Sequence, residues 1–177
     1  MKYSFLLLFI FAFISCKNQE ARRPIQATPS VTIYEAVKEE NKLINEIENK
    51  KIERYIQQDS LSIYTNSSYG FWYKYDIVST EENPKLKNGD EVELRYEIKN
   101  LNNEIIYSEE ELGIKSLKIG QQDFIPALQE GLKLMKIGET ITFVIPSYRA
   151  FGISGDGNKI GINQSILSTV TLINIKK

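Results

Sequence analysis

The chain has 177 residues, of which 42% are apolar and 25% charged, and this suits one globular domain with additional segments. Its formal net charge of −1 excludes the basic footprint of a nucleic-acid-binding protein. It contains no histidine and one cysteine, which excludes histidine-dependent nucleophiles, most zinc sites and any disulfide within the chain. We therefore expect neither a metal nor a cofactor.

Residues 1–15 are typical of a secretory signal peptide. Lys2 is followed by an apolar run from Phe5 to Ile14, too short to span a bilayer comfortably, and then by Ser15 and Cys16. A small residue before a cysteine resembles a bacterial lipoprotein signal, in which the cysteine is lipidated and becomes the first mature residue. An ordinary signal peptide with a chance cysteine is the alternative. We expect Cys16 to anchor the chain in a membrane outside the cytoplasm.

Residues 16–32 are predicted to form a polar tether. The segment contains Pro24 and Pro29 and has little apolar surface to bury. The residues after Cys16, "CKNQE", lack the acidic pair that directs some lipoproteins to the cell surface. The predicted location is the cell envelope, with the anchor in the outer membrane and the domain facing the periplasm.

Residues 33–66 are predicted to form a helical extension of one or two helices, with helix ending near Gln57. Apolar residues recur there at mostly helical spacing among Glu and Lys, without Gly or Pro. The extension either packs on its own domain or serves as a dimerising arm. The apolar stripe drifts after Ile47 and does not sustain heptads, which favours packing on the same domain.

Residues 67–177 have the pattern of a mostly β domain. "GFWYKYDIV" (70–78) is aromatic and β-branched, "EVELRYEIK" (91–99) alternates apolar and polar residues, and a polar turn leads to a hairpin partner, "IIYS". "TITFVI" (140–145) alternates again, and "ILSTVTLINI" closes the chain as a strand. We expect Trp72 to pack against the preceding helix rather than to bind a ligand.

One short helix is predicted within "QDFIPALQEGLKLM", because Phe124, Leu128 and Leu132 are spaced by four residues and Pro126 suits the first turn. We expect an interruption near Gly131. A polar loop from Gly152 to Ser165 follows; its glycines do not form a phosphate-binding motif, and loops of this length are often functional. The predicted fold class is α+β, an antiparallel sheet wrapped on one short helix.

Three stretches carry a family resemblance: "GDEVELRYEI", "IGQQDFIPALQEGLKLMKIGETITFVIPSYRAFG" and "SILSTVTLINI". Together they resemble FKBP-type peptidyl-prolyl cis–trans isomerases over about residues 68–177. The lipoprotein signal, "ARRPI", the charged helix and "GFWYKY" resemble a narrower group, the gliding-motility-associated FKBP-like lipoproteins. The resemblance implies an FKBP-like fold, isomerase activity on X-Pro segments of exported proteins, and gliding or secretion components as partners.

The resemblance also implies a set of pocket residues. Tyr96 matches the family's inward tyrosine, Phe124 an aliphatic wall, and Ile160 a contact from the long loop. The backbone N–H of Ile125 matches the donor to a substrate carbonyl. Leu128 and Ile106 stand where many members have aromatic residues, and they keep the pocket apolar.

Four positions depart from the family pattern. Tyr107 replaces an aspartate, Lys115 an aromatic residue and Ser168 a phenylalanine. Phe151 stands where the family's tyrosine hydroxyl reaches a substrate carbonyl, and it cannot donate that bond. We therefore expect reduced isomerase activity. The alternative is a non-catalytic chaperone or scaffold that binds proline-containing segments in the same groove.

Overall fold

The computed structural model describes residues 30–80 and 85–176, and side chains from residue 32 onward. The predicted signal peptide, Cys16 and nearly all of the predicted tether lie outside the described residues. The chain divides into two units, residues 1–38 and 39–177, and the sheet and the cavity lie in the second. No helix in the described part of the chain is long and apolar enough to cross a membrane.

The helical extension forms a single helix, α2 (Ser30–Gln58), and its end lies one residue beyond the predicted one. The absence of Gly and Pro permits this length. The C-terminal half packs on its own domain, because Ile52 is fully buried against Val144 and Leu167. Trp72 packs against this same cluster, together with Tyr55 of the helix, as predicted.

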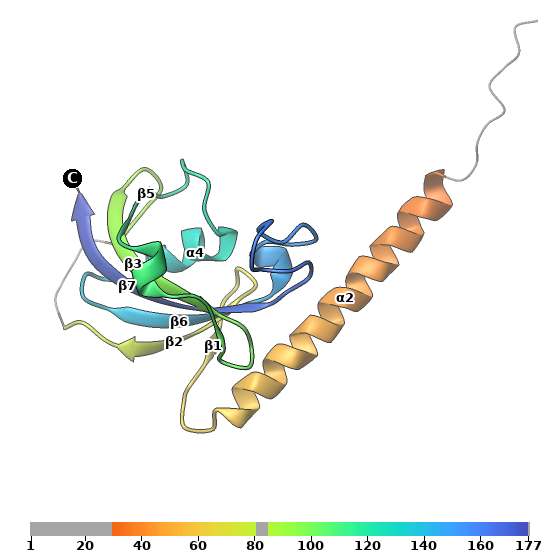
Figure 1. The fold of residues 1–177 in the computed structure, drawn as a ribbon, viewed down its shortest axis with the longest axis horizontal. Coiled ribbons are helices and arrows are strands. Elements are labelled where there is room, and N and C mark those ends of the chain that lie inside the picture. Colours follow the sequence, from red (N-terminus) through yellow and green to blue (C-terminus); the bar gives the residue numbers. More distant parts are fainter. Residues whose placement is uncertain (1–29, 81–84, 177) are drawn as a thin grey trace, which may run out of the picture. The chain divides into compact units, whose positions relative to one another are not determined.

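The sheet is antiparallel, with the strand order β1-β2-β6-β7-β3-β4, and β5 pairs with β3 (Figure 1). The elements are β1 (Thr65–Asn66), β2 (Trp72–Ile77), β3 (Glu91–Lys99), β4 (Ile105–Tyr107), α3 (Glu109–Leu112), β5 (Lys115–Lys118), α4 (Pro126–Gly131), η2 (Leu132–Leu134), β6 (Thr140–Ile145), η3 (Ser147–Arg149) and β7 (Ile166–Lys176). β3 and β6 have the predicted bounds, and β4 is the predicted hairpin partner of β3.

β6 differs from the prediction in burial, because all six of its residues are buried rather than alternate ones. Phe143 faces the main core, whereas Val144 faces the cluster around Ile52 of α2. On that second face Thr142 Oγ1 donates to Asp76 Oδ2 at 2.6 Å, so even the polar positions are covered. Apolar and polar residues alternate along β6, which predicts one solvent-exposed face. Helix α2 and the neighbouring strands cover that face.

The main core lies between the sheet and helix α4, which Figure 1 shows next to β3. The helix is short, and it turns into the 3-10 segment η2 after Gly131, where the interruption was predicted. Glycine is required there by close packing: an added Cβ would lie 2.5 Å from Cε1 of Phe143. The predicted α+β fold, with a sheet wrapped on one short helix and a helical extension before it, is confirmed.

Four short elements were not predicted from the sequence: β1, β5, α3 and η3. β1 pairs with β2 inside the segment predicted to be a helical extension. β5 pairs with the first half of β3, on the edge of β3 that does not pair with β7. α3 is a four-residue turn whose N-cap, Ser108, accepts a hydrogen bond from the backbone N–H of Glu111. These elements are too short for a periodic apolar pattern.

Candidate functional site: an apolar cavity at the end of the sheet

A cavity of about 460 Å³ opens between β3, β4, the start of α4 and the corner after β6. Most of its lining is apolar and comes from segments far apart in the sequence. The lining residues are Tyr96, Ile98, Tyr107, Leu112, Asp123, Phe124, Ile125, Pro126, Ala150, Phe151 and Asp156. The size suits a small side chain or ring together with the adjoining backbone.

Two aromatic rings form one side of the cavity. Tyr96 projects inward from the central strand β3 and is 9% exposed. Its ring meets the ring of Phe124 edge to face, with centroids 5.4 Å apart. Burial raises the pKa of the Tyr96 hydroxyl above its ordinary value of 10.0, so the group stays protonated at neutral pH.

Ile125 lies at the N-cap of α4, and Pro126 follows as the first helical residue. Proline fits there because the first turn of a helix needs no backbone donor. Among the described residues none accepts a hydrogen bond from the backbone N–H of Ile125, whereas its carbonyl accepts one from Leu128 N at 3.0 Å. Ile125 lines the cavity, and its N–H has no acceptor within the described residues.

Phe151 and Ala150 form another wall, at the corner that follows β6 and η3. The corner is fixed from its other side by Glu48 of α2, a buried carboxylate 3% exposed. Glu48 accepts hydrogen bonds from Ser147 N at 2.7 Å, Ser147 Oγ at 2.6 Å and Ser165 Oγ at 3.0 Å. The helical extension therefore holds both ends of the loop that adjoins the cavity.

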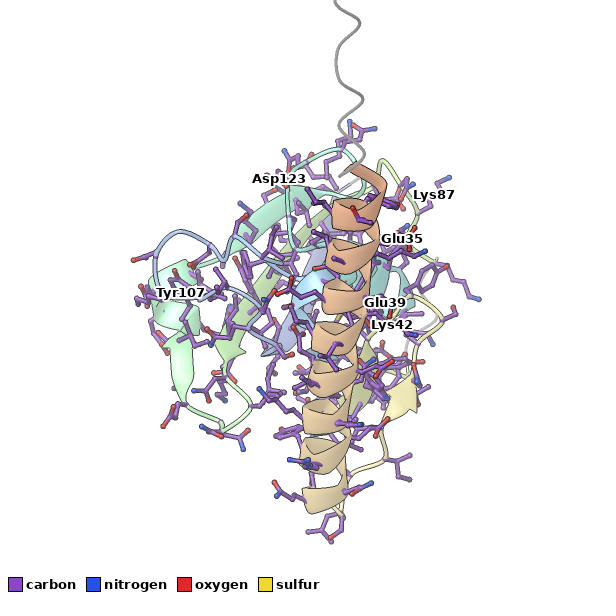
Figure 2. All side chains as sticks on the ribbon, turned by 90° about the vertical axis from the view of Figure 1, so that its right-hand side faces the viewer. Glu35, Glu39, Lys42, Lys87, Tyr107 and Asp123 are labelled. Atoms are coloured by element: carbon purple, nitrogen blue, oxygen red, sulfur yellow. The ribbon has the colours of Figure 1, made fainter. Side chains whose placement is uncertain are left out.

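Hydrogen-bonded polar side chains, Tyr107 and Asp156, form a further part of the cavity lining. The Tyr107 hydroxyl donates a short hydrogen bond to Asp156 Oδ2 and accepts one from Asn158 Nδ2 at 3.1 Å. The bond to Asp156 raises the pKa of Tyr107. Burial opposes ionisation of Asp156, yet hydrogen bonds from Tyr107 and from two backbone N–H groups hold its pKa below 3.8. Figure 2 shows Tyr107 beside the loop that follows β6.

Asp156 also shapes the loop that carries it. Its Oδ1 accepts hydrogen bonds from Asn158 N at 2.9 Å and Ile160 N at 2.8 Å. Gly155 has a φ of +66°, and an added Cβ would lie 2.3 Å from the carbonyl oxygen of Ile160. The loop conformation is thus fixed by one carboxylate and one close backbone approach.

The structure brings five of the eight residues predicted to form the pocket to the cavity lining: Tyr96, Tyr107, Phe124, Ile125 and Phe151. The other three do not line it but belong to the core around it. Leu128 and Ile160 are buried in the main core, and Ile106 is partly buried and packs against that core. Of the departures, Lys115 is exposed on β5, whereas Ser168 is fully buried and donates to the carbonyl of Glu97 at 3.0 Å.

Sequence reasoning missed Asp156 and Asp123, the two carboxylates of the lining. Asp123 precedes α4 and is exposed (Figure 2). Asp156 lies in a glycine-containing loop where nothing in the local pattern distinguishes it from a solvated turn residue. Within residues 30–80 and 85–176 no group of three or more histidine, cysteine, aspartate or glutamate side chains is placed to hold a metal ion.

The chain is similar in sequence to a curated protein. A curated relative, the probable FKBP-type peptidyl-prolyl cis-trans isomerase FkpA of Neisseria meningitidis, is 30% identical over 102 residues, which are 58% of this chain and 37% of the relative. The chain thus spans little more than a third of that relative's length.

Solved structures show the same fold. A peptidyl-prolyl cis-trans isomerase from Pseudomonas syringae has a TM-score of 0.62 at 19% identity, over 77% of this chain and 96% of its own. FkpA from Escherichia coli has a TM-score of 0.62 at 24% identity, over 99% of this chain and 82% of its own. The model of the FKBP-type peptidyl-prolyl cis-trans isomerases matches residues 82–173. The chain belongs to the FKBP-type peptidyl-prolyl cis–trans isomerase family.

Proposed function

We propose that the protein catalyses cis–trans isomerisation of X-Pro bonds in its cavity. The observation that carries this proposal is the combination of apolar walls, from Tyr96, Phe124 and Phe151, with an unused backbone donor, the N–H of Ile125. A prolyl ring fits the apolar walls, and the neighbouring carbonyl can accept the hydrogen bond. Apolar walls and a backbone donor suit a reaction that requires no nucleophile.

Rotation about a peptide bond has a barrier of about 18–20 kcal/mol, because resonance keeps the amide planar. The twisted amide is less charge-separated than the planar one, so moving it from water into an apolar cavity favours the twisted state. Uncatalysed X-Pro isomerisation takes tens to hundreds of seconds, which leaves room for catalysis by this effect alone. No proton is transferred at any step.

The proposed site of action is the cell envelope, on the periplasmic side of the outer membrane, with Cys16 as the lipid anchor. The short apolar leader and the small residue before Cys16 support this. The clients would be exported proteins, among them gliding or secretion components. Replacement Cys16→Ser should move the protein from the membrane to the soluble fraction of the cell. Retention of the variant in the membrane would contradict the anchor.

We propose that turnover is lower than in family members with a full set of pocket groups. Phe151 provides wall area but no hydroxyl, and the Tyr107 hydroxyl is already bonded to Asp156. The same observations favour a second candidate, a non-catalytic chaperone or scaffold that holds proline-containing segments. The two candidates differ in one measurable quantity, the rate of X-Pro isomerisation.

The proposal is tested with the purified full-length protein and a proline-containing peptide in a protease-coupled assay. Replacement Phe124→Asp places a charge in the cavity wall and should abolish acceleration. Leu61→Asp makes the same change at a side chain that is 98% exposed and should leave the rate unchanged. Circular dichroism checks that both variants are folded. A rate for Phe124→Asp equal to that of the unmodified protein would overturn the assignment.

A further inference from the structure

Of the polar side chains that line the cavity, some are hydrogen-bonded to one another and one donor has no partner among the described residues. Of the lining side chains, only Tyr96 and Tyr107 carry a hydrogen that can be donated; Asp123 and Asp156 are acceptors when ionised, and the rest are apolar. The single hydrogen of the Tyr107 hydroxyl goes to Asp156. Tyr96 therefore carries the remaining side-chain donor.

The Tyr96 hydroxyl has no hydrogen-bond partner among the described residues, although its side chain is only 9% exposed. In the described part of the chain, the solvent-shielded polar side-chain atoms without a partner are Asn49 Oδ1 and Arg149 Nε. The Tyr96 oxygen is not one of them, so solvent reaches it. Since Tyr96 lines the cavity, that solvent contact lies inside the cavity.

An X-Pro segment brings carbonyl oxygens into its binding site. The proline nitrogen carries no hydrogen, so the carbonyl oxygens that flank the prolyl bond are the backbone atoms that need a donor there. A buried polar group left unpaired is costly, and a carbonyl that enters this cavity leaves water behind. An unpartnered hydroxyl that faces the cavity and stays protonated meets this requirement.

The orientation of the Tyr96 ring is restrained. The edge-to-face contact with Phe124 fixes it on one side, and pairing of Tyr96 with Val170 of β7 fixes its backbone in the middle of the sheet. A restrained donor loses little side-chain entropy when a ligand binds. Phe151, on the corner wall of the same cavity, contributes apolar area without a hydroxyl.

We propose that the Tyr96 hydroxyl is a side-chain donor to a carbonyl that flanks the prolyl bond of the bound X-Pro segment. This deepens the proposed isomerase function and rests on it. The residue contacts substrate directly. The substrate class that fits is an extended peptide whose carbonyl next to the prolyl ring points towards β3.

The test compares Tyr96→Phe with Tyr75→Phe in the full-length protein. Tyr75 donates to the carbonyl of Leu134 at 3.2 Å and does not line the cavity. Tyr96→Phe should lower kcat/KM about three- to thirteen-fold, whereas Tyr75→Phe should not. Because the removed hydroxyl has no partner within the described residues, Tyr96→Phe should not lower the unfolding midpoint in urea. Adding Phe151→Tyr to Tyr96→Phe should restore part of the loss.

A second readout keeps the donor assignment separate from the isomerase assignment. Affinity for an X-Pro peptide is measured by fluorescence titration, which needs no turnover. If the unmodified protein binds the peptide but does not accelerate isomerisation, the proposed function fails, and weaker binding by Tyr96→Phe still supports the donor. Unchanged kcat/KM and unchanged affinity in Tyr96→Phe would overturn the donor assignment, as would failure of the unmodified protein to bind the peptide.

Discussion

The buried carboxylate of α2 and the unpartnered donors at the cavity differ in how they are used. On the face covered by α2, the buried carboxylate of Glu48 is fully occupied by Ser147 and Ser165. On the other face, the Tyr96 hydroxyl and the Ile125 N–H have no partner among the described residues, and both residues line a cavity. Satisfied buried groups stabilise a fold, whereas unused groups in a cavity are available to a ligand. The Glu48 contacts therefore support the structure, whereas the cavity is the site at which we propose that a ligand binds.

The largest expected effect comes from breaking the Glu48 contacts. Replacement Glu48→Ala leaves the buried backbone N–H of Ser147 and two buried hydroxyl groups without an acceptor. A loss of about 3 kcal/mol in the free energy of unfolding is expected. Urea denaturation measures it, with Glu53→Ala, an exposed glutamate of the same helix, as control. Equal stabilities of the two variants would show that the Glu48 contacts do not hold the corner.

A smaller effect is expected from a change in the loop that adjoins the cavity. Gly155→Ala forces the loop to move, because the new Cβ would lie 2.3 Å from the Ile160 carbonyl oxygen. Gly157 has a similar φ of +74° but no atom within 4 Å of an added Cβ, so Gly157→Ala is a matched control. We expect Gly155→Ala to lower kcat/KM about tenfold relative to the control. Indistinguishable rates would mean that the loop does not shape the cavity.

Restoring a hydroxyl to the cavity wall should have a modest effect of opposite sign. Phe151→Tyr adds a hydrogen-bond donor to the cavity wall after η3. It should raise kcat/KM about three-fold, the effect of a single neutral hydrogen bond. The same peptide assay measures it, and Tyr148→Phe, at a half-exposed neighbour outside the cavity, serves as control. No gain from a measurable baseline would indicate that the substrate carbonyl lies out of reach of this wall.

We expect kcat/KM to be independent of pH between about pH 5 and 9. The pKa values of Tyr96 and Tyr107 are raised above 10.0, by burial and by the bond to Asp156 respectively, so both stay protonated. The pKa of Asp156 is held below 3.8, so its stabilising contribution is complete above that value and is lost as pH falls through the lowered pKa. A bell-shaped kcat/KM profile would contradict a mechanism without proton transfer.

Much of the fold could be predicted from local pattern. Period-two alternation identified β3 and β6 to the residue, and four-residue spacing located α4 with its break at Gly131. The burial of both faces of β6 could not be predicted, because it depends on the position of α2, which alternation does not encode. β1 and α3 have too few residues for any period to be recognised.

The candidate site was less accessible to sequence reasoning. The apolar walls followed from family resemblance, but the Tyr107–Asp156 bond joins residues 49 positions apart and has no local signature. Glu48 resembles every other glutamate of its helix, and its burial is visible only once Ser147 and Ser165 are placed against it. Long-range polar pairs of this kind are set by topology and not by spacing.

The most direct test of the central claim is the cis–trans exchange rate of an X-Pro peptide, measured by NMR exchange spectroscopy with the full-length protein added in catalytic amounts. This measurement involves no coupling protease and reports isomerisation itself. We predict faster exchange with the unmodified protein than without it, and the uncatalysed rate with Phe124→Asp. An exchange rate that is the same with and without the unmodified protein would contradict the isomerase assignment.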